Sequence, residues 1–243
     1  MNLVVDVGNT LVKLAVFSGS NQVLKKTVLK SDFDKALDFL QEEYEAIDKA
    51  MLSVVGSFSE KSRAKLEKRF KVYVISPTIK LPFKSDYATP ETLGYDRIAL
   101  VSAAAAQYAN KNTLIIDVGT CITYDFLNSE GYYKGGAISP GIDMRYKALN
   151  QFTEKLPLLD ASIPQKLIGN STQTSIHSGV INGVTFEVDG IIGAYKQEYQ
   201  DLTVILTGGN AHFLRDRLKN SIFANPNFLL EGLNYLLEQN QNT

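Results

Sequence analysis

The chain has 243 residues, of which 44% are hydrophobic and 21% charged, values typical of a globular protein. Lys plus Arg number 25 and Asp plus Glu 26, so the formal net charge of -1 offers no global attraction to nucleic acid or to an anionic membrane. The single cysteine and the two histidines exclude an internal disulfide and a four-cysteine zinc site.

The first half of the chain alternates short β-rich runs with amphipathic or charged segments. These runs predict strands at 3–5, 11–17, 22–29, 50–55 and 72–75. Helices are expected at 31–44, 59–70 and 97–109, and Pro77, Pro82 and Pro90 predict an irregular stretch at 76–94.

The second half repeats this alternation and is richer in predicted helix. Strands are expected at 114–118, 122–127, 132–138 and 202–206. Helices are expected at 142–150, 171–199 with a break near Gly179, 211–219 and 228–239. No basic stretch precedes the first apolar run, which an acid soon interrupts, so we expect a cytoplasmic protein without a secretory signal. The uncharged stretch between Lys166 and Glu187 is too polar to cross a bilayer.

The opening of the chain recurs close to its midpoint. Residues 3–10, LVVDVGNT, are matched by residues 114–120, LIIDVGT, and a second β-rich run follows each copy. This similarity predicts a duplicated α/β unit, with lobes at 1–112 and 113–243 and a cleft between them.

Both copies end in a turn with the chemistry of a phosphate site. An Asp at the end of a buried strand needs a partner, and a hydrated divalent cation is a natural one. Gly8 lets backbone amides approach a phosphate, and Asn9, Thr10 and Lys13 add donors. The alternative is a hairpin in which Asp6 and Asn9 satisfy their own turn. The two matching copies favour the phosphate site. No Gly-Lys-Ser/Thr follows, so the turn is not a P-loop, and a strand rather than a helix follows the glycine, so it is not a dinucleotide fingerprint.

Two further segments carry candidate chemistry. Thr207-Gly208-Gly209-Asn210 is a third glycine turn, between a predicted strand and a predicted helix, where bare backbone would accommodate a nucleoside. Asp96 stands at a predicted helix start, where it is either an N-cap or a general base that accepts the proton of an alcohol. Arg97 beside it could hold a carboxylate or a phosphate.

In this order and spacing, the three turns and the duplication resemble the superfamily of acetate kinase, sugar kinases, Hsp70 and actin. The short length and Gly94-Tyr95-Asp96-Arg97 resemble type III pantothenate kinases within it, and the similarity runs nearly end to end. The segments GGAI at 135–138 and Pro140-Gly141 also fall in that family's order. The resemblance implies a duplicated ribonuclease-H-like, actin-like fold and the ATP-dependent phosphorylation of pantothenate, the first step toward coenzyme A.

The resemblance also assigns roles to positions of this chain. It implies an ATP site at Asp6, Val7, Gly8, Asn9, Thr10, Leu11, Val12, Lys13 and Thr120. It implies a pantothenate site at Tyr87, Gly94, Tyr95, Asp96, Arg97 and Thr172, with Asp96 as the proton acceptor. Magnesium would lie near Asp6, directly or through water, and potassium or ammonium at Asp117. Cys121 stands where the family usually has Ala, a small-for-small change.

A homodimer is the implied assembly, and neither nucleic acid nor a membrane is an expected partner. Three alternatives remain at this point. Another small-molecule kinase of the superfamily would share the phosphate turns but should lack Gly-x-Asp-Arg. A nucleotide-gated interaction protein such as actin or Hsp70 is usually longer than 243 residues. A transcriptional accessory factor would be expected to carry a basic recognition helix, which the sequence does not offer.

Overall fold

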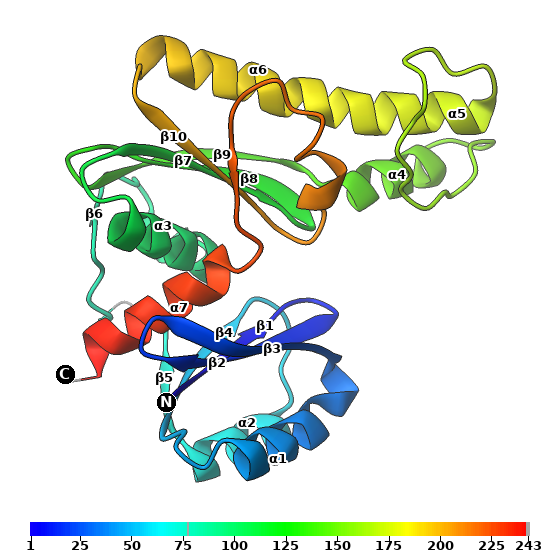
Figure 1. Ribbon diagram of the computed structural model, residues 1–243. Coiled ribbons are helices and arrows are strands. Elements are labelled where there is room, and N and C mark those ends of the chain that lie inside the picture. The colour runs from blue at the N-terminus through cyan, green and yellow to red at the C-terminus, as the bar shows by residue number, and fades with distance from the viewer. Residues whose placement is uncertain (77, 242–243) are drawn as a thin grey trace. The chain divides into compact units, whose positions relative to one another are not determined.

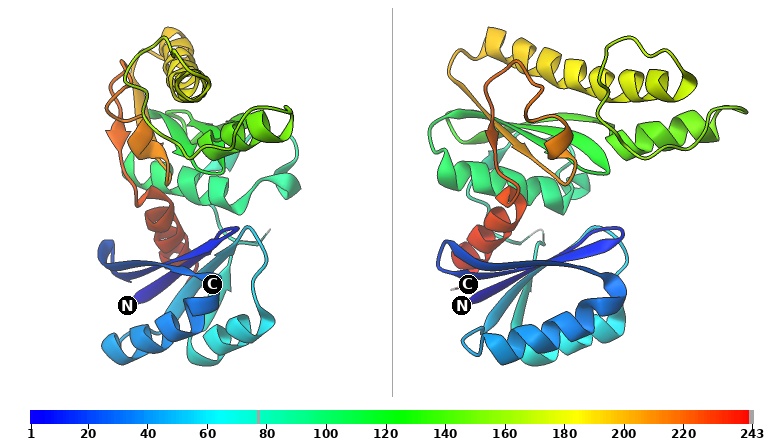
Figure 2. Two further views of the ribbon diagram at one scale, coloured as in Figure 1. Left: turned by 90° about the vertical axis from the view of Figure 1, so that its right-hand side faces the viewer. Right: turned by 45° about the vertical axis from the view of Figure 1, so that its right-hand side comes forward.

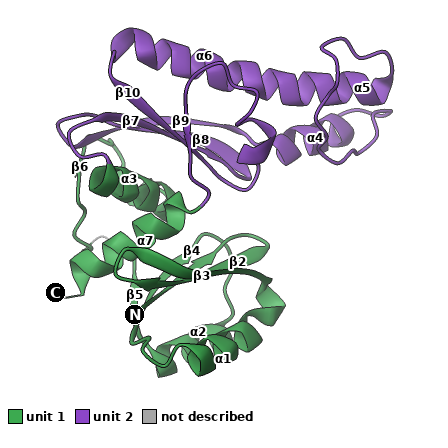
Figure 3. Cartoon of the chain, viewed as in Figure 1, with its two compact units in different colours: residues 1–107, 227–243 green, residues 108–226 purple. Residues whose placement is uncertain are grey.

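The computed structural model describes residues 1–76 and 78–241, which form two compact units (Figure 3). Unit 1 comprises Met1–Gln107 and Asn227–Thr243, and unit 2 comprises Tyr108–Pro226. The chain passes from unit 1 to unit 2 after Gln107, whereas the sequence predicts the boundary between lobes at 112. The C-terminal helix packs with unit 1, whereas the predicted lobes follow the order of the duplicated sequence.

Unit 1 contains a five-stranded sheet in the order β3-β2-β1-β4-β5 (Figure 1). Its strands are β1 (Asn2–Val7), β2 (Leu11–Ser18), β3 (Asn21–Leu29), β4 (Lys49–Val54) and β5 (Lys71–Val74). The first three strands pair antiparallel, while β4 and β5 run parallel to β1. All six residues of β1 are buried, which explains its nearly continuous apolar sequence.

Helices cover both faces of this sheet (Figures 1 and 2). They are α1 (Phe33–Glu43), α2 (Glu60–Arg69), α3 (Tyr95–Gln107) and α7 (Phe228–Asn240), with short elements at η1 (Lys30–Asp32), β6 (Lys84–Ser85) and η2 (Pro90–Thr92). Leu3, Val5 and Val7 of β1 pack in the same core cluster as Leu37 and Leu40 of α1. Residues of β1 alternate between faces, so Asn2, Val4 and Asp6 point toward the opposite face. There the Asn2 side chain donates to Asn234 of α7.

Unit 2 repeats this sheet. Its strands are β7 (Asn112–Val118), β8 (Cys121–Leu127), β9 (Tyr132–Pro140), β10 (Leu202–Thr207) and β11 (Phe223–Ala224). They follow the order β11-β10-β7-β8-β9, with β7, β8 and β9 antiparallel and β10 and β11 parallel to β7. The order and the pairing sense match those of unit 1 strand for strand, which confirms the predicted duplicated α/β fold.

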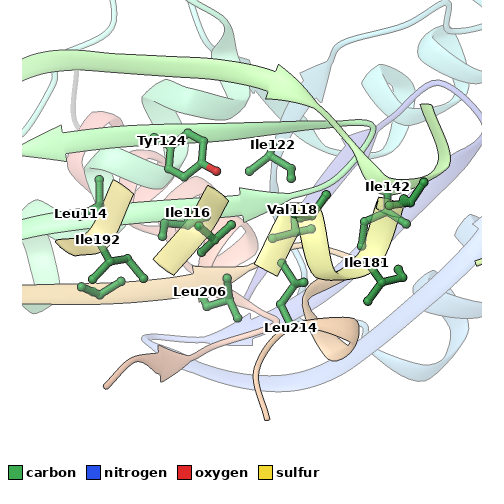
Figure 4. Close-up of a cluster of buried hydrophobic side chains, with 14 of the residues drawn as sticks. Leu114, Ile116, Val118, Ile122, Tyr124, Ile142, Ile181, Ile192, Leu206 and Leu214 are labelled. Carbon is green, nitrogen blue, oxygen red and sulfur yellow. The ribbon is translucent and has the colours of Figure 1, made fainter. Parts of the chain in front are cut away.

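A long helical segment covers one face of the second sheet (Figure 1), and Figure 4 shows Ile192 of that segment in the same core cluster as Leu114 of β7. Leu114, Ile116 and Val118 of β7 share a core cluster with Val188 and Ile192. The helical elements of this unit are α4 (Ile142–Gln151), α5 (Thr172–His177), η3 (Ser178–Asn182), α6 (Gly183–Glu198) and η4 (Ala211–Phe213).

Two helix predictions in unit 2 need correction. The helix expected to break near Gly179 continues through η3, a π-helical segment, into α6. The helix predicted at 211–219 is wrong, because only a 3-10 turn forms at Ala211–Phe213. The chain then makes isolated turns, and the Asp189 carboxylate accepts the backbone N–H groups of Lys219 and Asn220. A helix-like sequence was therefore overridden by tertiary hydrogen bonds.

Candidate active site

Asp6 is the penultimate residue of β1 and only 4% exposed. In the sheet it stands opposite Lys13 of β2 and Ser53 of β4. The Lys13 ammonium lies 3.3 Å from the Asp6 carboxylate. Directly opposed residues place their side chains on the same face of a sheet, so strand register alone assembles this group.

Burial makes the charged form of Asp6 less favourable. Burial raises the pKa of the Asp6 carboxyl above its usual value, and the nearby Asp96 carboxylate adds to the rise, while Lys13 and the Ser53 hydroxyl oppose it. A buried carboxylate with a second carboxylate in range favours a bound cation. The structure thus brings Asp6, Lys13 and Asp96 together within unit 1.

The turn after β1 is tight, and its polar residues are exposed to solvent. Gly8 donates its N–H to the Leu11 carbonyl at 3.0 Å, while Asn9, Thr10 and Leu11 are exposed and Val7 and Val12 are buried. A Cβ added to Gly56, in the loop after β4, would lie 3.1 Å from both the Gly8 carbonyl oxygen and the Asn9 Oδ1. The turn therefore packs closely against Gly56.

Gly94-Tyr95-Asp96-Arg97 forms the start of α3. The helix begins at Tyr95, and Ile98 donates its N–H to the Gly94 carbonyl. Asp96 is thus inside the first turn rather than at the N-cap, and its Oδ1 accepts the N–H of Arg97 at 2.9 Å. A Cβ on Gly94 would lie 2.5 Å from that same Oδ1, so a larger residue would force the carboxylate out of this position.

Arg97 connects this helix start to the preceding loop. The residue is 5% exposed, and its Nη1 lies 3.4 Å from the Tyr87 hydroxyl. Its guanidinium carbon is 5.5 Å from the centre of the Tyr87 ring, within cation–π range. Tyr87 and Arg97, which are ten positions apart, are therefore in contact.

Asp117 occupies the same place in unit 2 as Asp6 does in unit 1. It is the penultimate residue of β7 and stands opposite Thr123 of β8 and Thr207 of β10. The position that holds Lys13 in unit 1 thus holds a hydroxyl here. The Thr123 hydroxyl oxygen is buried without a hydrogen-bond partner in the part of the chain that the structure describes.

The glycine turn after β10 lies against Asp117. Gly208 has φ +99°, and a Cβ there would lie 2.4 Å from the Asp117 Oδ1 and 2.5 Å from the backbone of Val118. Asn210 donates its N–H to the Val118 carbonyl at 2.9 Å. Only glycine at 208 lets the two turns approach this closely.

Thr120 follows β7 and lies against Gly141, the residue before helix α4. It is exposed, and its carbonyl accepts the N–H of Gly141 at 3.1 Å. A Cβ on Gly141 would lie 2.2 Å from that carbonyl oxygen. Asn210 donates its side-chain amide to Asp143 in the first turn of α4. Asp117, Thr120, the glycine turn and the start of α4 are thus gathered in unit 2.

Thr172 lies elsewhere in unit 2, exposed at the first position of α5. Ser171 and Thr174 form a capping box around it, with the Thr174 N–H donating to the Ser171 hydroxyl. Neither contact uses the Thr172 side chain.

The donor set suits hard cations that keep water or phosphate ligands. Among residues 1–76 and 78–241, no three His, Cys, Asp or Glu side chains gather as a protein-only metal site. The Asp6 carboxylate could supply one oxygen to a largely hydrated divalent cation. Asp117 with the orphaned Thr123 hydroxyl offers oxygens that suit a monovalent cation.

Some of these residues could not be found from motifs. Ser53, Thr123 and Gly56 carry no motif and enter the site only through strand register and loop packing. The one available signal was their position beside or just after a predicted strand of the duplicated pattern.

Comparison with known proteins identifies the family of the chain. The family model described as type III pantothenate kinase matches residues 2–194. A type III pantothenate kinase from Christiangramia forsetii is 51% identical over 241 residues, covering 99% of each chain.

Solved structures share the fold at low identity. A Campylobacter jejuni protein named for the Baf family of transcriptional activators superposes with a TM-score of 0.65 at 20% identity, covering 99% of this chain and 100% of the other. A Listeria monocytogenes protein named as an N-acetylmannosamine kinase gives 0.54 at 10% identity, covering 99% of each. No helix among the described residues has the length and apolar character needed to span a membrane. With a family match over most of its length and a relative at half identity end to end, the chain belongs to the type III pantothenate kinase family.

Proposed function

We propose that this protein transfers the γ-phosphoryl group of ATP to the primary hydroxyl of pantothenate, giving 4'-phosphopantothenate in the first step toward coenzyme A. The family to which the chain belongs supports this reaction. The observation that carries it is the pair of carboxylates in unit 1, where Asp96 lies close enough to buried Asp6 to raise its pKa. One carboxylate can serve the phosphate side of such a site and the other the acceptor hydroxyl.

The phosphates of ATP would be bound by Asp6 to Lys13, with Thr120 as a further contact. The exposed side chains of Asn9 and Thr10 and the bare backbone at Gly8 support this role, because they present donors to solvent at the end of a rigid strand. The Lys13 side chain is 41% exposed, so its ammonium can contact a phosphate oxygen while it stays near the Asp6 carboxylate.

Pantothenate would be bound by Tyr87, by Gly94 to Arg97 and by Thr172. The contact between Arg97 and Tyr87 supports the first part of this set, because a guanidinium held over a phenol ring is pre-organised to bind a carboxylate. Thr172 is assigned by family resemblance, and its exposed hydroxyl at the start of α5 is compatible with that role.

Asp96 would act as the proton acceptor. The pantothenate hydroxyl oxygen bonds to the γ-phosphorus, the bond from that phosphorus to the bridging oxygen breaks, and ADP leaves. The hydroxyl proton passes to an oxygen of Asp96 as the new bond forms. The Arg97 N–H holds Oδ1 of Asp96, which orients the carboxylate and leaves Oδ2 for the substrate.

Two cations would accompany the nucleotide, Mg²⁺ near Asp6, directly or through water, and K⁺ or NH₄⁺ at Asp117. Bound there, they would supply positive charge that neutralises the phosphates. The raised pKa of Asp6 and the orphaned hydroxyl of Thr123 support these placements.

The enzyme would work in the cytoplasm as a homodimer. Ile138, Met144 and Phe186 of unit 2 are large apolar side chains that are 63%, 38% and 56% exposed. They stand on β9, α4 and α6, which Arg145 ties together through hydrogen bonds to Ser139 and Glu187. Exposed apolar side chains on elements that are joined by hydrogen bonds support pairing with a second copy of the chain.

A coupled assay tests the proposed function. We expect ADP release that needs ATP, Mg²⁺ and pantothenate together, with a higher rate in potassium than in sodium salts, and light scattering should give the mass of a dimer. ADP release with a sugar instead of pantothenate would identify another kinase of the superfamily. ATP hydrolysis without any acceptor would indicate a nucleotide-gated protein.

A further inference from the structure

A cavity of about 480 Å³ lies in unit 2 between α5 and the segment that joins α4 to α5. The segment runs beside α5 in the views of Figures 1 and 2. Its lining includes Ser162, Lys166, Asn170, Gln173, Thr174 and His177. The volume is within the range of small-molecule sites. None of its lining residues belongs to the ATP or pantothenate positions assigned above.

His177 is the buried polar group of this cavity. The residue is 9% exposed, and its Nδ1 lies 2.8 Å from the hydroxyl oxygen of Tyr146 on α4. Tyr146 is 2% exposed and does not line the cavity. The ring therefore meets Tyr146 through one nitrogen and faces the cavity with other atoms.

The Tyr146 contact fixes which nitrogen carries the proton. Burial raises the pKa of the Tyr146 hydroxyl, so it keeps its proton at neutral pH. The Tyr146 oxygen already accepts a backbone hydrogen bond from Ser162. We therefore assign its O–H as the donor to His177 Nδ1, the side-chain acceptor within reach. The proton of the neutral imidazole then lies on Nε2, which becomes a donor without a protein partner in the described chain.

The rest of the lining is rich in donors. It contains no Asp or Glu among the described residues, and Lys166 supplies a positive charge. Neither the Lys166 ammonium nor the Gln173 amide forms a hydrogen bond or an ion pair within the described part of the protein. A buried N–H donor and an ammonium that line the same cavity match an acceptor-rich ligand with negative charge.

We propose that this cavity binds a small anionic group, a carboxylate or a phosphate, through Nε2–H of His177 and the ammonium of Lys166. Tyr146 is a positioning residue in this site, because it orients the imidazole and sets its tautomer. The site lies outside the groups assigned to phosphoryl transfer and would hold a second ligand or a charged part of a larger one.

Nitrogen NMR of the imidazole rings tests this directly, because the chain has only two histidines. His212 supplies an internal reference of opposite kind, since its Nδ1 lies 2.9 Å from the Gly209 carbonyl and must be the donor there. We expect the Nε2–H form for His177, and a saturable shift of its signals on titration with inorganic phosphate or with acetate. The anion that binds more tightly identifies the group. The Tyr146→Phe variant should mix the two tautomers of His177.

Two lysine variants distinguish anion binding in the cavity from a nonspecific effect of the protein's positive charge. Lys166→Gln should weaken the titrated anion about tenfold, as expected when a charged hydrogen-bond donor is lost. Lys155→Gln, an exposed lysine of the same segment outside the lining, should leave the affinity unchanged. Both positions are exposed, so both variants should fold. An Nδ1–H form of His177, signals that neither anion shifts in a saturable way, or equal effects of the two variants would overturn the proposal.

Discussion

The two units place an aspartate at the same point of the same sheet and surround it differently. Asp6 faces Lys13 and Ser53, whereas Asp117 faces Thr123 and Thr207. In unit 1 a protein ammonium offsets the buried carboxylate, and in unit 2 hydroxyls take that place. The difference teaches that the duplication kept the backbone register, while the side chain directly across the strand pair changed from an ammonium to a hydroxyl.

The turns differ in the same way. Gly8 bonds to the Leu11 carbonyl, three residues on, while Gly119 bonds to the Cys121 carbonyl, two residues on. The longer turn of unit 1 exposes both Asn9 and Thr10, and the shorter one exposes Thr120. The unit with more donors is the one proposed to hold most of the phosphate contacts.

The largest expected effect comes from Asp96, the carboxylate at the start of α3 in unit 1. Asp96→Asn removes the proposed proton acceptor, so kcat should fall about 10²- to 10⁴-fold while ATP affinity, measured by calorimetry, stays nearly unchanged. Asp32→Asn, the same change at the start of α1, should retain activity. Near-normal turnover by the Asp96 variant would contradict the assignment.

The second test removes the difference between the two aspartate sites by changing the residue opposite Asp117. Thr123→Lys places an ammonium where Lys13 stands in unit 1, so the residue itself would supply the charge at Asp117. We expect the rate to lose its dependence on potassium over sodium, measured at fixed ionic strength. Thr27→Lys, on exposed strand β3, is the matched control and should keep that dependence. Unchanged potassium activation in Thr123→Lys would remove Asp117 as the cation site.

Gly56 follows β4 and Gly208 follows β10, the fourth strand of each unit in chain order, and both glycines test how closely each turn is packed. Gly208→Ala must accept both φ +99° and a Cβ at 2.4 Å from the Asp117 Oδ1, whereas Gly56→Ala meets its nearest atoms at 3.1 Å. We expect losses in the free energy of unfolding of about 2–5 kcal/mol and about 1 kcal/mol respectively. The chain has no Trp, so urea unfolding is best followed by circular dichroism. Equal losses would mean that the two turns are equally tolerant.

The smallest effect should be a gain in stability. The raised pKa of Asp6 means that the folded protein binds this proton more tightly than the unfolded chain. Its contribution is therefore favourable at low pH and is lost as the pH rises from the usual Asp value of 3.8 through the raised one. Asp6→Asn should raise Tm by about 2–4 °C at neutral pH and lower activity sharply. A lower Tm would show that the Lys13 pair outweighs the cost of burial.

Local pattern predicted most of the fold. The apolar run Leu3 to Val5 and its copy Leu114 to Ile116 fixed two equivalent central strands, because a strand buried on both faces has to be apolar throughout. The predicted helix at 211–219 failed because the Asp189 carboxylate, far away in sequence, binds the backbone there.

The sequence by itself determined the duplication, the two aspartate turns, the Gly94-to-Arg97 motif and the family, since each depends on residue types at short spacing. Only the tertiary structure decided which side chains share a face with those aspartates. Strand register brought Lys13 and Ser53 to Asp6 and Thr123 to Asp117, and helix packing brought Asp96 within range of Asp6. The physical reason is that pairing between strands and packing between elements join residues that no local spacing connects.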